Sequence, residues 1–337
     1  MSKKWFFLLL MAFCFACNEN NTEKYQGNRG NVVDVSSKLT VIEFDDILFN
    51  MIVEPYIFND NLVIVDRKSD GSLIYIFDKN TFSYITSAGK LGRGPGEISS
   101  MGDVEYDEIK NELLVTDHTK QCVFSYNMDS LLINPLHLPY EKTKLDVTAF
   151  ISRYVYINDT LSIGELIEPT GNCTFRESLA KWNMVSGALE KMPYEHPDIE
   201  EKRISFAVSE KYGIYVEGYN YHDLMTICSL DGNLKYNVYG NKWDSKNSKK
   251  MVYYAFGLAF CGDKILAMYM GENNINDNGT AAYATKFLVF DINGDYIETL
   301  EIGRSIIYFC YDDENNRLIM TLDDEMQFAY LDLNGLI

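Results

Sequence analysis

The sequence predicts an all-β protein built as a six-bladed β-propeller. One short pattern, an apolar or aromatic strand that ends in Asp or Asn and is closed by a polar turn, recurs about 40 to 60 residues apart, the length of one blade. Strand-like runs also alternate with turn signals from Leu39 nearly to the end, without a sustained helical period. The recurring segments are Tyr75–Asp78, Phe124–Asn127, Ala180–Asn183, Cys228–Asp231, Leu288–Asp291 and Ala329–Asp332.

The spacing divides the propeller, residues 37–337, into blades at about 47–90, 101–142, 146–193, 203–240, 252–303 and 305–337. The last unit is short, whereas Leu39–Phe44 is a strand that precedes the first complete unit. We therefore expect this N-terminal strand to complete the last blade. Such closure hides the strand edges that an open ring would expose to aggregation.

The N-terminus has the pattern of an export signal. Two lysines precede an apolar run from Trp5 to Phe15, which is too short to span a bilayer comfortably. Ala16 and Cys17 then precede a polar stretch and resemble a bacterial lipobox, in which Cys17 becomes the lipidated first residue. Cys14 fits this role less well because it follows a bulky residue, and an ordinary cleaved signal with an incidental cysteine is the alternative. We expect a lipoprotein signal peptide over 1–16 and a flexible tether over 17–36.

Composition excludes several classes of function. The formal net charge is −19, and it becomes −21 when residues 1–16 with their two lysines are removed. A chain this acidic repels nucleic acid and anionic head groups, so the membrane must be reached through the lipid. The cysteines after Cys17 are widely spaced without a CxxC pair, and the four histidines are dispersed, so neither a disulfide framework nor a zinc site is predicted.

A family resemblance centres on residues 65–126. The segments that carry it are Val65-Asp66, Leu73–Asp78, Gly89–Glu97, Val115–Asp117 and Val123–Tyr126, which resemble the NHL-type propeller repeat. The Gly-Arg-Gly-Pro-Gly-Glu form at 92–97, behind a lipobox, resembles the TolB-like six-bladed propeller lipoproteins of Bacteroidetes. The resemblance implies an anchor in the cell envelope, at the outer membrane, and a binding role. The side of the membrane stays open, because few acidic residues follow Cys17.

Three residues are candidates for ligand contact. Arg93 and Glu97 lie in the glycine-rich segment, where they either pair with each other or project to the mouth of the ring. This segment is not a phosphate loop, because no Gly-Lys-Ser/Thr leads into a helix; its glycines permit a tight path between blades. Trp243 lies in the only basic cluster, residues 240–250, and either contacts a partner or packs on the rim. The loop around Asn276 is oxygen-rich but lacks the EF-hand order, so we expect a solvated loop.

Glu54 opens the first blade and gives an enzyme alternative. Its turn weakly resembles that of gluconolactonase and related calcium lactonases, where an early Glu is a metal ligand. Calcium needs several oxygen ligands that converge on one point, and a single matching residue does not supply them. Otherwise Glu54 is an ordinary carboxylate at a strand edge.

The expected function is therefore non-catalytic binding, with no cofactor, by the mouth or loops of the ring. The expected partners are the membrane, through the lipid, and an envelope protein or a glycan or peptide ligand. Two alternatives stay open: a calcium-dependent lactonase-like hydrolase, with Ca²⁺ bound by Glu54, and an accessory subunit of an outer-membrane nutrient-uptake complex.

Overall fold

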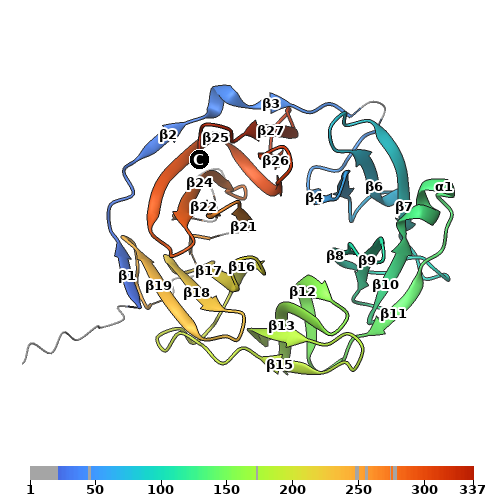
Figure 1. The fold of residues 1–337 in the computed structure, drawn as a ribbon, viewed down its shortest axis with the longest axis horizontal. Helices are drawn as coiled ribbons and strands as arrows, with labels where there is room; N and C mark the ends of the chain where they lie inside the picture. Colours follow the sequence, from blue (N-terminus) through green and yellow to red (C-terminus); the bar gives the residue numbers. More distant parts are fainter. Residues whose placement is uncertain are drawn as a thin grey trace, which may run out of the picture.

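The computed structural model arranges the strands as blades around a central axis (Figure 1). It describes residues 22–44, 47–171, 174–246, 250–254, 257–273, 275 and 279–337. The predicted signal peptide, Cys17 and Asn276 lie outside these residues. The fold is all-β, as the sequence predicts, with one short helix, α1 (Met128–Ile133).

Six blades follow in chain order, and each is antiparallel. Blades 1 and 2 contain β4 (Glu54–Phe58), β5 (Asn61–Val65), β6 (Ser72–Asp78), β7 (Tyr84–Lys90), β8 (Met101–Asp107), β9 (Glu112–Asp117), β10 (Cys122–Asn127) and β11 (Tyr140–Lys144). Blades 3 and 4 contain β12 (Phe150–Asn158), β13 (Leu161–Gly171), β14 (Thr174–Trp182), β15 (Leu189–Lys191), β16 (Ile204–Ser209), β17 (Ile214–Tyr219), β18 (Leu224–Ser229) and β19 (Leu234–Gly240).

Blades 5 and 6 share a strand. They contain β21 (Leu258–Cys261), β22 (Lys264–Tyr269), β24 (Ala284–Asp291), β25 (Tyr296–Asp312), β26 (Arg317–Leu322) and β27 (Phe328–Asp332). Because β25 is the outer strand of blade 5 and then the inner strand of blade 6, the two blades form one continuous sheet. A small ribbon of β20 (Met251–Val252) and β23 (Glu272–Asn273) lies beside blade 5.

The ring closes as the sequence predicts. β3 (Thr40–Val41) pairs antiparallel with β27 and adds the outer strand that the last blade lacks. The next residue, Ile42, continues the pairing through a hydrogen bond from its backbone N–H to the carbonyl of Phe328 at 3.0 Å. Ile42 is buried in a cluster that also contains Val53 and Leu62 of blade 1, so this strand joins the last blade to the first.

Residues 23–41 form a belt around the outside of blades 4, 5 and 6 (blue in Figure 1). β1 (Glu23–Gln26) pairs parallel with β19, and β2 (Val32–Asp34) pairs parallel with β25. We expected a flexible tether over 17–36, but in its described part, from Thr22, β1 and β2 are strands paired with the ring. The physical reason is that the outer strands of blades 4 and 5 offer unpaired backbone groups, which this segment satisfies.

A buried ion pair fixes the belt to the blades. The Arg29 guanidinium lies 2.9 Å from the Asp223 carboxylate and donates to the Tyr254 hydroxyl at 3.2 Å. The side chain of Arg29 is 8% exposed and that of Asp223 is 0% exposed. Burying either charge alone would cost free energy, and the close contact between the two opposite charges offsets this cost.

The recurring Asp or Asn closes the turn after the third strand in blades 1, 2, 3, 5 and 6, and Ser229 accepts the turn hydrogen bond in blade 4. In blade 1 the Asp78 carboxylate accepts hydrogen bonds from the backbone N–H groups of Asn80 and Thr81 at 2.9 and 2.7 Å. Equivalent bonds are made by the side chains of Asn127, Asn183, Asp291 and Asp332. Asp and Asn favour such turns because their side-chain oxygen accepts hydrogen bonds from nearby backbone N–H groups, as a backbone carbonyl would in a turn.

Apolar layers between adjacent blades form the core. One cluster contains Val63 and Ile74 of blade 1 together with Val104 and Val115 of blade 2, all buried. Among the described residues, no helix is both long and apolar enough to cross a membrane.

Candidate ligand-binding site

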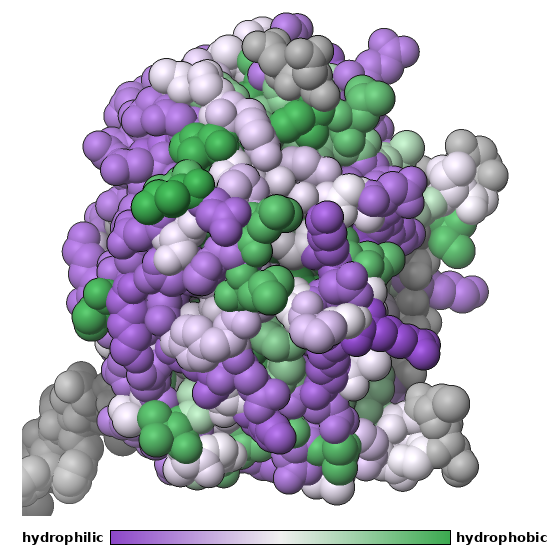
Figure 2. All heavy atoms as spheres, turned by 90° about the vertical axis from the view of Figure 1, so that its right-hand side faces the viewer, coloured by the Kyte–Doolittle hydropathy of each residue, from purple (hydrophilic) through white to green (hydrophobic). Residues whose placement is uncertain are grey.

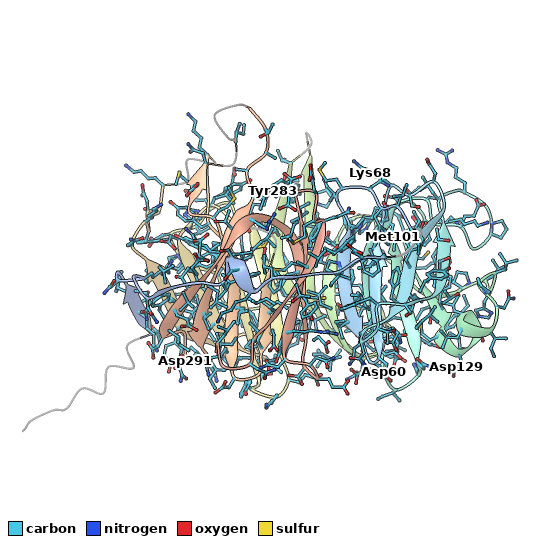
Figure 3. The ribbon with its side chains drawn as sticks, turned by 90° about the horizontal axis from the view of Figure 1, so that it is seen from above. Asp60, Lys68, Met101, Asp129, Tyr283 and Asp291 are labelled. Carbon is cyan, nitrogen blue, oxygen red and sulfur yellow. The ribbon has the colours of Figure 1, made fainter. Side chains whose placement is uncertain are left out.

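The two faces of the ring carry different connections. Lys68, between β5 and β6, Met101, at the start of β8, and Tyr283, before β24, lie on one face (Figure 3). Asp60, Asp129 and Asp291 lie on the other. We call the first the loop face, because it carries the turns between second and third strands and the connections between blades. Loops from every blade converge there around the axis.

Charged side chains gather where the inner strands reach the loop face. Glu54, the first residue of β4, lies 2.8 Å from the Arg67 guanidinium, which also donates to the carbonyl of Gly102 at 3.1 Å. Asp103 of β8 accepts a hydrogen bond from the backbone N–H of Tyr154 at 2.7 Å. These contacts join blades 1, 2 and 3.

The same network continues into blade 4. Arg153 donates to the Glu165 carboxylate at 3.2 Å and to the carbonyl of Ile204 at 3.1 Å. Glu177 accepts from the backbone N–H of Ile204 at 2.8 Å and lies 3.8 Å from the guanidinium of Arg203. We call the set the mouth network: Glu54, Arg67, Asp103, Arg153, Glu165, Glu177 and Arg203.

Three carboxyl groups in this region bind protons more tightly than usual. Burial, with the nearby Glu54 charge, raises the pKa of Asp103 to about 7. Burial, with its contact to Glu165, raises the pKa of Glu177 to about 8. Burial and the charge of Asp103 raise the pKa of Glu105 on the same inner strand. This region therefore holds fewer negative charges at neutral pH than its residues suggest.

We expect these carboxyls to make the fold less stable as the pH rises. In the folded protein Asp103 and Glu177 keep their protons up to about pH 7 and 8, whereas in the unfolded chain they lose them near pH 4. The stabilising contribution is complete below the unfolded pKa and is lost as the pH rises through the folded pKa. Glu177→Gln should therefore reduce the fall in unfolding free energy between about pH 4 and about pH 8, measured by urea titration.

The exposed Glu190 of β15 provides the control, because Glu190→Gln should leave this pH dependence unchanged. A Glu177→Gln variant with the wild-type slope would show that the carboxyl titrates normally.

A cleft opens beside the mouth network. It lies between the tip of the β13–β14 hairpin and the segment 195–203 that leads into β16, and its volume is about 440 Å³. Phe175 is 40% exposed at its edge, and the Arg203 guanidinium stacks on the Phe175 ring at 4.1 Å. Glu177, His196 and Tyr219 line the interior. The cleft thus combines an exposed ring with hydrogen-bonding groups of both charges, a combination suited to ligand binding.

Trp243 lies behind this cleft and is half-buried. Its ring contacts those of His196, Tyr239 and His222, with centroid distances of 5.4, 4.9 and 5.8 Å. The His196 ring lines the cleft, and its Nε2 atom shares a hydrogen bond with the Tyr239 hydroxyl at 2.9 Å. Trp243 therefore packs against the wall of the cleft.

Arg93 and Glu97 lie elsewhere, in the connection from β7 to β8. The Glu97 carboxylate accepts a hydrogen bond from the backbone N–H of Gly94 at 2.6 Å, and Arg93 is exposed. A Cβ atom on Gly92 would lie 2.1 Å from this carboxylate, so a larger residue there would displace the Glu97 side chain.

Glu54 is committed to an ion pair. Its carboxylate contacts Arg67, whose positive charge competes with any cation for the same oxygens. Within the described parts of the chain, no group of three or more His, Cys, Asp or Glu residues is arranged to hold a metal ion.

Comparison with known proteins identifies the fold but not the ligand. Residues 27–165, less than half of the chain, match the DUF5128 family, described as a 6-bladed beta-propeller. No curated protein has a significantly similar sequence.

Solved structures resemble the whole ring. A DUF4221 family member from Bacteroides vulgatus is 11% identical, with a TM-score of 0.63 over 87% of this chain and 97% of that one. A Bacteroides fragilis protein inferred to be exported is 15% identical, with a TM-score of 0.55 over 89% and 88%. Regucalcin from Agrobacterium tumefaciens, a calcium-binding protein, is 10% identical, with a TM-score of 0.52 over 89% and 94%. At these identities the likeness shows the fold alone.

Sequence reasoning missed most of the mouth network. Its members come from four blades, and the pairs that matter are not close in the chain. One usable signal exists: Asp103 and Glu105 alternate on β8, the inner strand of blade 2. Charges at every second position of a strand lie on one face of its sheet, and here that face meets blade 3, where Asp103 and Glu105 accept hydrogen bonds from the backbone N–H groups of Tyr154 and Tyr156.

Proposed function

We propose that this protein is a lipid-anchored propeller of the cell envelope that binds a glycan or peptide at its loop face without catalysing a reaction. One observation carries the proposal: the cleft of about 440 Å³ lies directly beside the mouth network and shares Glu177 and Arg203 with it. The polar groups of the network are held in ion pairs and backbone hydrogen bonds. Such an arrangement orients a ligand but offers no activated nucleophile.

Three features support an envelope location. The apolar run Trp5–Phe15 and the lipobox-like Cys17 are typical of an exported lipoprotein. The glycine motif resembles that of TolB-like and NHL-related envelope propellers. A protein of similar fold from Bacteroides fragilis is inferred to be exported. Together they favour an outer-membrane anchor at Cys17.

A photo-crosslinking experiment in intact membranes tests this function. A benzophenone amino acid replaces Phe175 at the edge of the cleft, and the control carries it at Val185, which is 73% exposed in the turn between β14 and β15. Both positions belong to blade 3, but the turns after third strands lie on the opposite face (Figure 3). We expect a discrete crosslinked product from position 175 and none from position 185.

The anchor is tested in the same cells. Cys17→Ser should move the protein from the membrane to the soluble fraction, whereas Cys14→Ser should leave it in the membrane. Equal crosslinking from both faces, or no product from position 175, would contradict binding at the cleft. A soluble wild-type protein would contradict the anchor.

A further measurement distinguishes a calcium-dependent hydrolase from a protein that only binds its ligand. If Ca²⁺ raised the melting temperature of the wild-type protein but not of Glu54→Gln, and the protein hydrolysed a lactone, catalysis would replace simple binding. Recovery of a stable outer-membrane transporter with the crosslinked protein would instead identify an uptake-complex subunit.

A further inference from the structure

A second pocket lies on the outer perimeter between blades 1 and 2, away from the loop-face cleft. Its volume is about 310 Å³. One wall is the glycine-rich connection with Gly89 and Gly96, and the other is the segment 135–138 between α1 and β11. Gly96 has a φ of +73°, and a Cβ there would lie 2.8 Å from the side chain of Leu138. The glycine-rich connection between β7 and β8, which does not contribute to the loop-face cleft, therefore shapes this pocket.

A hydroxyl without a partner lies in the pocket lining. Tyr126 of β10 is 1% exposed and lines the pocket, and its hydroxyl has no hydrogen-bond partner in the described parts of the chain. Burial raises the pKa of this phenol, so it stays neutral and can donate a hydrogen bond. A buried polar group without a partner costs free energy, which a ligand with an acceptor would recover.

Exposed apolar side chains surround the pocket. Leu91, Leu132, Ile133, Leu136 and Leu138 are between 46% and 86% exposed. Figure 2 looks at the side of the ring that carries α1, and hydrophobic side chains gather in the middle of this face among polar ones. Apolar groups clustered at a pocket are typical of a protein-binding surface, and they extend the contact beyond what a small molecule would cover.

We propose that this perimeter pocket binds an extended peptide of a partner protein. One apolar side chain of the peptide packs against Leu138 in the pocket, and an adjacent carbonyl accepts a hydrogen bond from the Tyr126 hydroxyl. Lys90 is exposed at the rim, so an acidic residue next to the apolar one complements the site.

The rest of the ring supports an extended occupant. The outer edges of blades 4 and 5 each hold an additional extended strand of this chain, β1 and β2. The outer strand of blade 2, β11, pairs only with β10 among the described strands, so its other edge is open to the same kind of pairing.

A membrane surface fits this site less well than a peptide. Acyl chains offer no acceptor to the Tyr126 hydroxyl. α1 and β1 lie on opposite sides of the ring (Figure 1), so the pocket is far from the point where the described chain begins after Cys17.

A random peptide library displayed on phage is the probe, with the purified chain lacking its signal segment as the target. We expect enriched peptides in which an apolar residue adjoins an acidic one. Tyr126→Phe should weaken the binding of such a peptide about three- to tenfold, measured by fluorescence anisotropy, because one hydrogen bond is lost. Leu138→Ala should weaken it about tenfold.

Matched variants separate binding from folding. Tyr215→Phe removes a buried hydroxyl of blade 4, far from the pocket, and Ile109→Ala shortens an apolar side chain that is 91% exposed. Both should leave the affinity unchanged, and Tyr126→Phe should keep the wild-type melting temperature. The proposal is overturned if no enriched peptide depends on Tyr126 and Leu138. It is also overturned if these variants instead reduce binding to phosphatidylethanolamine–phosphatidylglycerol vesicles or dissociate a dimer in light scattering.

Discussion

Arg29→Met is expected to lower the free energy of unfolding by about 3–5 kcal/mol, the usual cost of leaving a buried charge unpaired. The variant leaves the Asp223 carboxylate at 0% exposure without the guanidinium that lies 2.9 Å from it. It also removes the hydrogen bond to the Tyr254 hydroxyl, which belongs to the connection between blades 4 and 5. Urea unfolding followed by tyrosine and tryptophan fluorescence measures the loss.

Two further variants separate the buried pair from a general loss of charge. Arg29→Met combined with Asp223→Asn should recover part of the stability, because the unpaired charge is gone. Arg304→Met breaks a surface pair with Asp324, whose side chains are 41% and 29% exposed, and should cost less than about 1 kcal/mol. Equal losses for Arg29→Met and Arg304→Met would show that the belt is not held by this contact.

Ile42→Ala is expected to cost about 2–5 kcal/mol, because a buried side chain is truncated where the ring closes. Ile42 is 3% exposed and packs with Val53, Leu62, Ile319 and Phe328, so the cavity would open between the last blade and the first. Hydrogen exchange of the backbone amides of β3 and β27 should rise together, and urea unfolding gives the total loss.

The neighbouring Val41 is the matched control. It lies on the same strand and pairs with Ala329, but its side chain is 46% exposed. Val41→Ala should cost less than about 1 kcal/mol, since little apolar surface leaves the core. If the two substitutions had equal effects, backbone pairing rather than packing of Ile42 would hold the ring closed.

Local signals explain why the blades could be predicted from the sequence. The turn after each third strand is fixed by a short side chain such as Asp78, which binds backbone groups two and three residues later. An interaction this local leaves a regular trace in the chain. The same regularity showed that the last blade lacked a strand, which β3 supplies.

The belt and the mouth network have no comparable regular pattern in the sequence. β1 pairs with β19 more than two hundred residues away, and its sequence is polar, as a tether would be. Asp103 and Arg153 meet only after blades 2 and 3 have been placed beside each other around the axis. The sequence named Trp243, yet its position behind the cleft depends on three rings from other segments.

The belt also constrains the order in which the chain can fold. Residues 23–41 leave the ribosome before their partners in β19, β25 and β27. These contacts join residues that are far apart in the chain. Forming them requires the closure of a long loop, which costs conformational entropy and lowers the folding rate. Until Ala329 and Tyr330 emerge, blade 6 cannot be completed and the seam with blade 1 exposes unpaired strand edges. Closure of the ring therefore waits until the last blade has been synthesised.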